Sequence, residues 1–368
     1  MNPMEELRAA RPDHLADGPV DPRTRHAELA HAFARPRQAP RRSRKPLVWS
    51  LGLAAAAAAV TAVAVVGVPE TVQRRPTAAA TTAAATTELS ARDILLVAAT
   101  NAEREPADSG EFWYVSNKWR TLFKTNEGFV ISLGGESETW VGAGEQHFTM
   151  RDLGPTPATD ADRALWEQAG SPREVSFSGQ KRITMREGAS KPHTGKSNDK
   201  EIFWLGRNVT MADLQALPSD PEALKADLLR FYKGQATESN APSTEDGWLF
   251  QVAEGLITTM PVSPEVRAGA FRMLAGLPSV TSLGQVTDAA GRTGTAIAIE
   301  GESQSTPGDA KKGVVQIQLI IDEKSGRALG RQSVVVVAGG AQQGLEPGTV
   351  WNAMTILESG WTDERPSS

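Results

Sequence analysis

Residues 314–338 read VVQIQLIIDEKSGRALGRQSVVVVA, and this stretch decides the fold class of the chain. Every second residue of its first part is a large apolar one: Val315, Ile317, Leu319 and Ile321. That period of two is typical of a β-strand with one buried face. The DEKSG segment at residues 322–326 has the composition of a hairpin turn, with Gly326 available for a left-handed backbone position. Residues 328–338 then return, so we predict an antiparallel hairpin.

Helices are predicted before this hairpin. Residues 220–222 (DPE) and 263–265 (SPE) each combine a capping side chain, a proline in the first turn and an acid at the positive end of the helix dipole. We expect the first of these helices to end at Gly234 and the second at Gly276. Residues 249–256 carry apolar side chains at helical spacing and predict a third helix.

Two more helix starts are marked by capping pairs. Ser90 with Asp93 makes a capping box, and Thr210 with Asp213 caps a short helix. We expect the ordered domain to begin near Ser90, because the sequence before it is of low complexity.

Strands are predicted on both sides of the helical region. The candidate stretches are residues 112–119, 139–150, 173–185, 202–205, 295–300 and 350–357. Because strands and helices come in runs and do not alternate, the sequence favours an α+β domain with a mainly antiparallel sheet. The pattern also looks loosely like half-barrel sheets with helices against the open face, a likeness of fold alone. It leaves open whether residues 88–368 form one extracytoplasmic domain or two subdomains that meet near residue 205.

A long apolar stretch lies upstream of all these elements. Residues 47–68 read LVWSLGLAAAAAAVTAVAVVGV, without a single charge. At ~1.5 Å per residue, a helix of that length spans about 33 Å, close to the ~30 Å hydrocarbon core of a bilayer. We predict a transmembrane helix here. A cleaved signal peptide is the alternative, although its apolar part is usually only ~7–15 residues long. The Ala/Thr/Pro-rich residues 69–87 predict a tether.

Charge sets the orientation of the predicted span. Residues 1–45 carry ten Lys/Arg and six Asp/Glu, a net charge of +4, so the rest of the chain carries −9 of the total of −5. A basic cluster directly precedes the span: Arg41, Arg42, Arg44 and Lys45. The positive-inside rule then places residues 1–46 in the cytoplasm. We predict a single-pass protein of the cell membrane, embedded in the lipid bilayer, with its C-terminal domain outside the cytoplasm.

Composition excludes several classes of function. The chain has no cysteine, so disulfides, thiol nucleophiles and Cys-ligated metals are excluded. Its net charge of −5 argues against direct nucleic-acid binding. The common hydrolase, P-loop and zinc-protease motifs are absent. We therefore predict a protein that is not an enzyme, with no catalytic, cofactor-binding or metal-binding residues.

The histidines and acidic residues downstream of the span do not indicate a catalytic or metal site either. His147 and His193 are the only histidines there, and neither lies in a metal-ligand spacing. Glu136 and Glu138 are flanked by glycines and predict a solvated loop. The aromatic residues of this region favour a packed core over a ligand groove: Phe112, Trp113, Tyr114, Trp119 and Trp140. Aromatic residues on both faces of one strand would still leave one face for a ligand or partner.

The cytoplasmic segment is the candidate partner-binding region. Residues 1–46 hold too few large apolar side chains to fold alone. Leu29 and Phe33 lie one helical turn apart, and we predict that they bind a partner's groove as the segment folds. A solvated, disordered tail is the alternative interpretation.

The whole chain resembles an actinobacterial family of single-span membrane proteins of unassigned activity. The stretches that carry the resemblance are residues 4–13, 90–99, 111–120, 216–228, 263–300 and 320–330, together with the Arg-rich flank and the span. Genes of that family often lie beside sigma-factor genes, so the resemblance implies envelope signalling and a cytoplasmic sigma factor as partner. The expected function is a non-enzymatic envelope sensor or regulator. The alternative is a membrane-tethered binding domain for a lipid or another hydrophobic ligand.

Overall fold

The structure, a computed structural model, describes residues 89–106, 108–177, 181–186, 188–237, 241–303 and 311–366, all within one compact unit. The predicted cytoplasmic segment 1–46 with Leu29 and Phe33, the predicted span 47–68 and the tether 69–87 lie outside these residues. Within the described ranges, no helix has the length and apolar character needed to cross a membrane.

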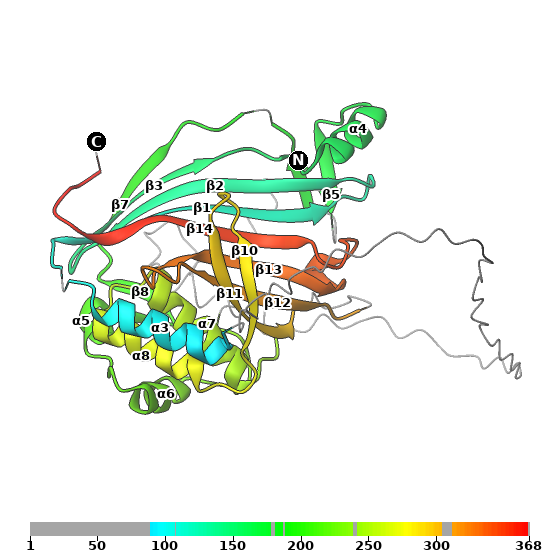
Figure 1. The fold of residues 1–368 in the computed structure, drawn as a ribbon. Coiled ribbons are helices and arrows are strands. Elements are labelled where there is room, and N and C mark those ends of the chain that lie inside the picture. The colour runs from blue at the N-terminus through cyan, green and yellow to red at the C-terminus, as the bar shows by residue number, and fades with distance from the viewer. Residues whose placement is uncertain are drawn as a thin grey trace, which may run out of the picture. The chain divides into compact units, whose positions relative to one another are not determined.

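A large antiparallel sheet organises this part of the chain (Figure 1). Nine of its ten strands follow the order β10-β11-β12-β13-β14-β1-β2-β3-β7, and β4 pairs with β2. The strands are β1 (Phe112–Lys124), β2 (Val130–Val141), β3 (Gln146–Asp152), β4 (Thr156–Pro157), β7 (His193–Ser197), β10 (Thr281–Thr287), β11 (Thr293–Glu302), β12 (Val314–Ile321), β13 (Ala328–Val337) and β14 (Val350–Thr362). Two hairpins stand apart from it, β5 (Glu174–Phe177) with β6 (Lys181–Thr184) and β8 (Glu201–Trp204) with β9 (Arg207–Thr210). The predicted α+β fold with a mainly antiparallel sheet is confirmed.

Helices pack against one face of the sheet around β11 and β12. They are α3 (Ala91–Glu103), α5 (Met211–Gln215), α6 (Pro221–Leu229), α7 (Glu245–Thr258) and α8 (Pro264–Ala275), gathered in the lower part of Figure 1. The main hydrophobic core lies between these helices and the sheet, where Ile297 and Leu319 meet Phe250 and Phe271. Burying each such side chain contributes roughly 1.5–3 kcal/mol of transfer free energy, so this layer holds most of the domain together.

The hairpin read from residues 314–338 is confirmed. β12 and β13 pair antiparallel, and Leu319 and Ile321 are fully buried in the main core. Gly326 takes the expected left-handed conformation, with φ 73°. Glycine is needed there for a second reason, because a Cβ atom would lie 2.7 Å from the backbone oxygen of Ala98 on α3. The turn therefore packs directly on the first helix.

Predicted helix starts are confirmed, whereas one predicted end is wrong. Ser90 and Thr210 both form their capping boxes, and α8 is capped by Ser263 and ends before Gly276. α6, however, ends at Leu229, before the expected Gly234. The chain turns there because the ring of Tyr232 packs 5.8 Å from that of Trp248 on α7, a tertiary contact that the local sequence does not reveal.

Three local predictions in the first half of the domain are wrong. Residues 139–150 form the end of β2 and the start of β3, separated by a turn at 142–145. Residues 173–185 likewise contain a hairpin, β5–β6, and not one strand. Glu136 and Glu138 lie on β2 and not in a loop, because their glycine neighbours pair within the sheet opposite Trp119 and Arg120 of β1.

Two small cores hold the half of the sheet formed by β14, β1 and β2. At one end, Trp113, Val115 and Ile356 form a cluster that Met211 of α5 joins. At the other, Phe129, Ile131 and Val175 pack with Trp166 of α4 (Asp160–Gln168), the helix at the far end of the sheet in Figure 1. The candidate functional surface lies near the first of these clusters, on the other face of the same strands.

Candidate functional site

The two faces of β1 have different surroundings. Trp113 and Val115 point toward the cluster with α5, so Tyr114, between them, points to the opposite face. There Tyr114 pairs with Trp140 of β2 and Gly360 of β14. The Tyr114 and Trp140 rings are tilted by 41°, with their centroids 4.9 Å apart. Pleating thus places an aromatic pair on the sheet face away from the helices.

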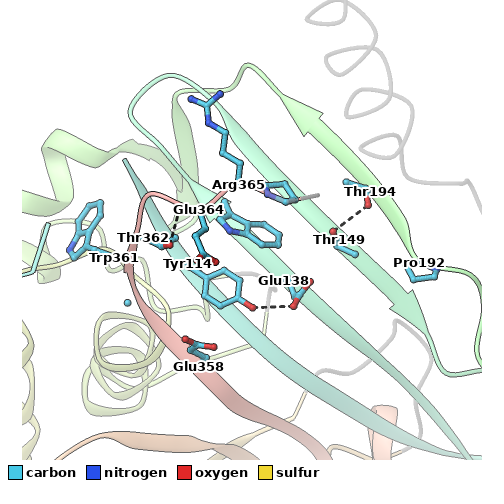
Figure 2. Close-up of a pocket in the computed structure, with 13 residues that line it drawn as sticks. Tyr114, Glu138, Thr149, Pro192, Thr194, Glu358, Trp361, Thr362, Glu364 and Arg365 are labelled. Atoms are coloured by element: carbon cyan, nitrogen blue, oxygen red, sulfur yellow. Dashed lines mark hydrogen bonds between the residues drawn. The ribbon is translucent and has the colours of Figure 1, made fainter. Parts of the chain in front are cut away.

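An open groove of about 850 Å³ lies over this aromatic pair (Figure 2). Residues of β1, β2, β3, β7 and β14 line it, together with Pro192, which precedes β7, and residues 364–366, which follow β14. Its lining residues are Tyr114, Glu138, Trp140, Thr149, Pro192, Thr194, Glu358, Gly360, Trp361, Thr362, Glu364, Arg365 and Pro366. The volume is within the range of small-molecule binding sites in proteins.

Three carboxylates line the groove without a counter-ion. Within the described part of the chain, no cationic side chain forms an ion pair with Glu138, Glu358 or Glu364. The Tyr114 hydroxyl donates a hydrogen bond of 3.0 Å to Glu138 Oε1. Figure 2 shows the Tyr114 ring between Glu138 and Glu358. Burial raises the pKa of Tyr114, and the negative charges of Glu138 and Glu358 raise it further.

Donor groups complete the polar side of the groove. Trp140 is only 8 % exposed and lines the groove, yet its indole N–H has no hydrogen-bond partner among the residues described. On the opposite wall, the hydroxyls of Thr149 and Thr194 lie 3.3 Å apart (Figure 2). An acceptor supplied from the groove would take a hydrogen bond from the indole N–H, a gain of about 0.5–1.5 kcal/mol.

The chain beyond β14 folds back over one rim of the groove. The backbone N–H of Glu111 donates 2.9 Å to Asp363 Oδ1. Arg365 forms an ion pair with Glu111, and its guanidinium carbon lies 5.3 Å from the centroid of the Phe112 ring. These contacts tie residues 363–366 to the start of β1.

A charged cluster adjoins that rim. Glu145 Oε1 lies 3.0 Å from His147 Nε2, and Glu145 Oε2 lies 2.5 Å from Lys196 Nζ. Hydrogen bonds from Lys196 and then His147 lower the pKa of Glu145 from 4.5 to about 2. Glu145 is therefore a carboxylate throughout the physiological pH range, and the cluster fastens the β2–β3 turn to β7.

The cluster lacks the arrangement of a catalytic or metal site. Within the described residues, His147 makes no hydrogen bond to a hydroxyl, and no three metal-ligating side chains gather. His147 pairs with Lys196, whereas His193 pairs with Met150 three residues away, so the two histidines lie on opposite faces of the sheet. The structure does not bring His147 and His193 together.

Sequence reasoning identified only part of this groove. Tyr114 and Trp140 were named as aromatic residues for which a packed core was favoured over a ligand groove, and both line the groove. Glu138 was misplaced in a loop, and Glu358, Glu364 and Arg365 gave no local signal. Their shared position depends on β14 pairing with β1 across more than 200 residues of chain, which no local pattern encodes.

Comparison of the chain with protein-family models, with curated proteins and with solved structures found no match.

Proposed function

We propose that this chain is a single-pass, membrane-anchored and non-enzymatic regulator whose extracytoplasmic domain binds a ligand in the groove over Tyr114 and Trp140. The observation that carries the proposal is the groove itself, which combines an aromatic pair, an indole N–H and three carboxylates. In the part of residues 89–366 that the structure describes, no side chain accepts from that N–H and no cation pairs with the carboxylates, although Glu138 accepts from the Tyr114 hydroxyl. Such convergence of apolar and polar groups is typical of recognition sites.

The groove favours binding over catalysis. Its walls offer hydrogen-bond acceptors and donors, but the nearest histidine, His147, is held by Glu145 outside the lining. General acid–base catalysis needs a positioned group whose pKa lies near the working pH. Glu145, beside the groove, has its pKa lowered to about 2, away from that range.

The rest of the proposal rests on sequence. The uncharged residues 47–68 behind a basic flank support a membrane anchor with residues 1–46 in the cytoplasm. Helices on one face of a large antiparallel sheet are compatible with a half-barrel-like domain outside the membrane. Leu29 and Phe33 are the proposed contacts to a cytoplasmic partner, for which a sigma factor is the leading candidate.

The test is capture of the partner by the full-length chain. Cross-linking in intact cells followed by purification and mass spectrometry should recover a sigma factor. Replacing Leu29 and Phe33 together by Asp should abolish the capture, because both apolar anchors are lost, while the protein still reaches the membrane. Replacing Thr24 and Gln38 by Asp adds the same charge without removing an anchor and serves as the control.

Two outcomes of that experiment count against the regulator. One is that no cytoplasmic protein is captured by the native chain. The other is that the Leu29/Phe33 variant captures the partner as efficiently as the native chain does. Either result moves the alternative function forward.

That alternative is binding of a lipid or another hydrophobic ligand, and one observation favours it. On the face opposite the groove, Trp119 is 36 % and Met150 48 % exposed. Met354 pairs directly with Trp119, and the Trp119 ring covers Gly135 on the neighbouring strand. These apolar side chains lie on the same face of the sheet. Replacing Met150 by Asp should then weaken binding of a fluorescent fatty acid at least ~10-fold, whereas Thr149→Asp on the other face should not.

A further inference from the structure

We propose that the groove recognises a hydroxylated amine of the amino-sugar type, with a free ammonium group. This deepens the proposed function and rests on the groove being a ligand site. The three kinds of group that line it each correspond to one part of such a molecule: carboxylates to the ammonium, aromatic rings to the apolar face of the sugar, and N–H and O–H donors to its oxygens.

The carboxylates determine the charge of the ligand. Glu138, Glu358 and Glu364 share one groove and have no ion-pair partner in the part of the chain described. A positive charge brought into a groove lined by carboxylates is attracted by each of them. Arg365, the cation at the rim, is already paired with Glu111. The free position therefore suits a positive charge brought by the ligand.

The aromatic pair determines the second part. Trp140 and Tyr114, whose rings are tilted by 41°, both line the groove, so a ligand there contacts aromatic rings as well as carboxylates. Ring faces attract cations within about 6 Å and pack well against C–H groups. A pyranose ring offers such an apolar face, whereas a simple metal ion does not.

The donors determine the third part. The indole N–H of Trp140, which lines the groove, has no partner among the described residues. An ammonium group has no lone pair to accept from it. An oxygen on the ligand can accept from this N–H, and the hydroxyls or ring oxygen of a sugar provide one. The Thr149 and Thr194 hydroxyls on the facing wall can serve further sugar hydroxyls.

The experiment compares three disaccharides that share one shape. Calorimetric titration of the full-length chain, kept in a sugar-free non-ionic detergent, uses the glucosamine dimer, its N-acetylated form and cellobiose. We expect saturable binding of the glucosamine dimer at pH 6, with an affinity that falls as salt rises. The acetylated dimer and cellobiose should bind at least about 10-fold more weakly, because a charge-assisted hydrogen bond is replaced by a neutral one.

Matched variants locate the site. Glu138→Gln with Glu358→Gln keeps the side-chain shape and removes two charges, and should weaken binding of the glucosamine dimer about 100-fold. Trp140→Phe keeps a ring and removes the N–H, and should weaken binding of all three disaccharides by up to about 10-fold. Glu346→Gln removes one charge from an exposed residue outside the groove lining and should leave the affinity unchanged. Melting curves of every variant show whether it is folded.

The unfavourable outcomes are distinct. If none of the three disaccharides binds, or the Glu138/Glu358 variant binds as well as the native chain, the amino-sugar proposal is overturned. Equal binding of all three shows a neutral sugar site and overturns recognition of the ammonium. None of these results bears on capture of a cytoplasmic partner through Leu29 and Phe33, so the regulator can fail or stand separately.

Discussion

Glu105 connects the helices to the sheet through two arginines. It accepts a 2.7 Å hydrogen bond from Arg267 of α8 and a 2.8 Å one from Arg327, which follows the β12–β13 turn. The Arg267 side chain is only 12 % exposed, and burial lowers its pKa, whereas that of Arg327 is 57 % exposed. The same carboxylate therefore makes one buried and one exposed ion pair.

Substitutions on either side of that carboxylate should differ in cost. Glu105→Gln leaves the buried Arg267 without a counter-charge and should lower the free energy of unfolding by about 3 kcal/mol. Arg327→Gln removes only the exposed pair and should cost about 0.5 kcal/mol or less. Urea unfolding followed by tryptophan fluorescence measures both. Equal losses would show that Arg267 is effectively solvated.

Glu145 makes the stability of the domain dependent on pH. Its pKa is about 2 in the folded chain against an ordinary 4.5, because Lys196 and His147 stabilise the carboxylate. Its contribution is complete above about pH 4.5 and is lost as the pH falls toward 2. The melting temperature of the native chain should therefore fall more steeply over this interval than that of Glu145→Gln. The Glu346→Gln control should show the same dependence of melting temperature on pH as the native chain. Identical dependence in all three proteins would refute the role of Glu145.

At the scale of elements, the β12–β13 turn is fixed by a glycine that meets two demands. Gly326 has φ 73°, and an added Cβ would lie 2.7 Å from Ala98 O on α3. Gly291, in the β10–β11 turn, has φ 81° but no atom within 4 Å of an added Cβ. Gly291→Ala should thus cost only the backbone term, about 1 kcal/mol, and Gly326→Ala should cost about 2 kcal/mol or more because α3 must also shift. Thermal unfolding of the two variants separates the backbone cost from the cost of shifting α3. Equal costs would mean that α3 shifts without loss of stability.

Elements whose signals are local were predictable from sequence. The capping boxes at Ser90 and Thr210, the alternating apolar residues of β12 and the glycine of its turn all act within a few residues of chain. α6 was predicted too long because Tyr232 packs on Trp248, a contact outside that window.

The groove was predictable only in its aromatic half. Tyr114 and Trp140 lie in strands whose composition is visible, although the turn at 142–145 between β2 and β3 was missed. The acidic half depends in part on β14 lying beside β1, which pairs Glu358 with Ser116, two residues along the strand from Tyr114. This strand pairing depends on interactions across the whole sheet, so it cannot be predicted from residues 350–357 alone.

At the scale of the whole molecule, the proposed topology can be tested directly. A reporter that is active only outside the cytoplasm, fused after Ser368, should be active because residues 41–45 retain the N-terminus inside. Replacing the four basic residues of that flank by Ala should reduce the active fraction. An inactive fusion, with intact protein in the membrane, would contradict the orientation.

Because the residues after β14 return to the groove, a fluorescent dye can be attached beside it. Pro366 lines the groove, and the chain contains no cysteine, so Pro366→Cys would create a single thiol beside the ligand. An environment-sensitive dye attached there would be exposed to the same water as the groove. Its emission would change when a bound molecule displaces that water. Occupancy could then be followed in living cells, and compounds could be screened, before the natural ligand is known.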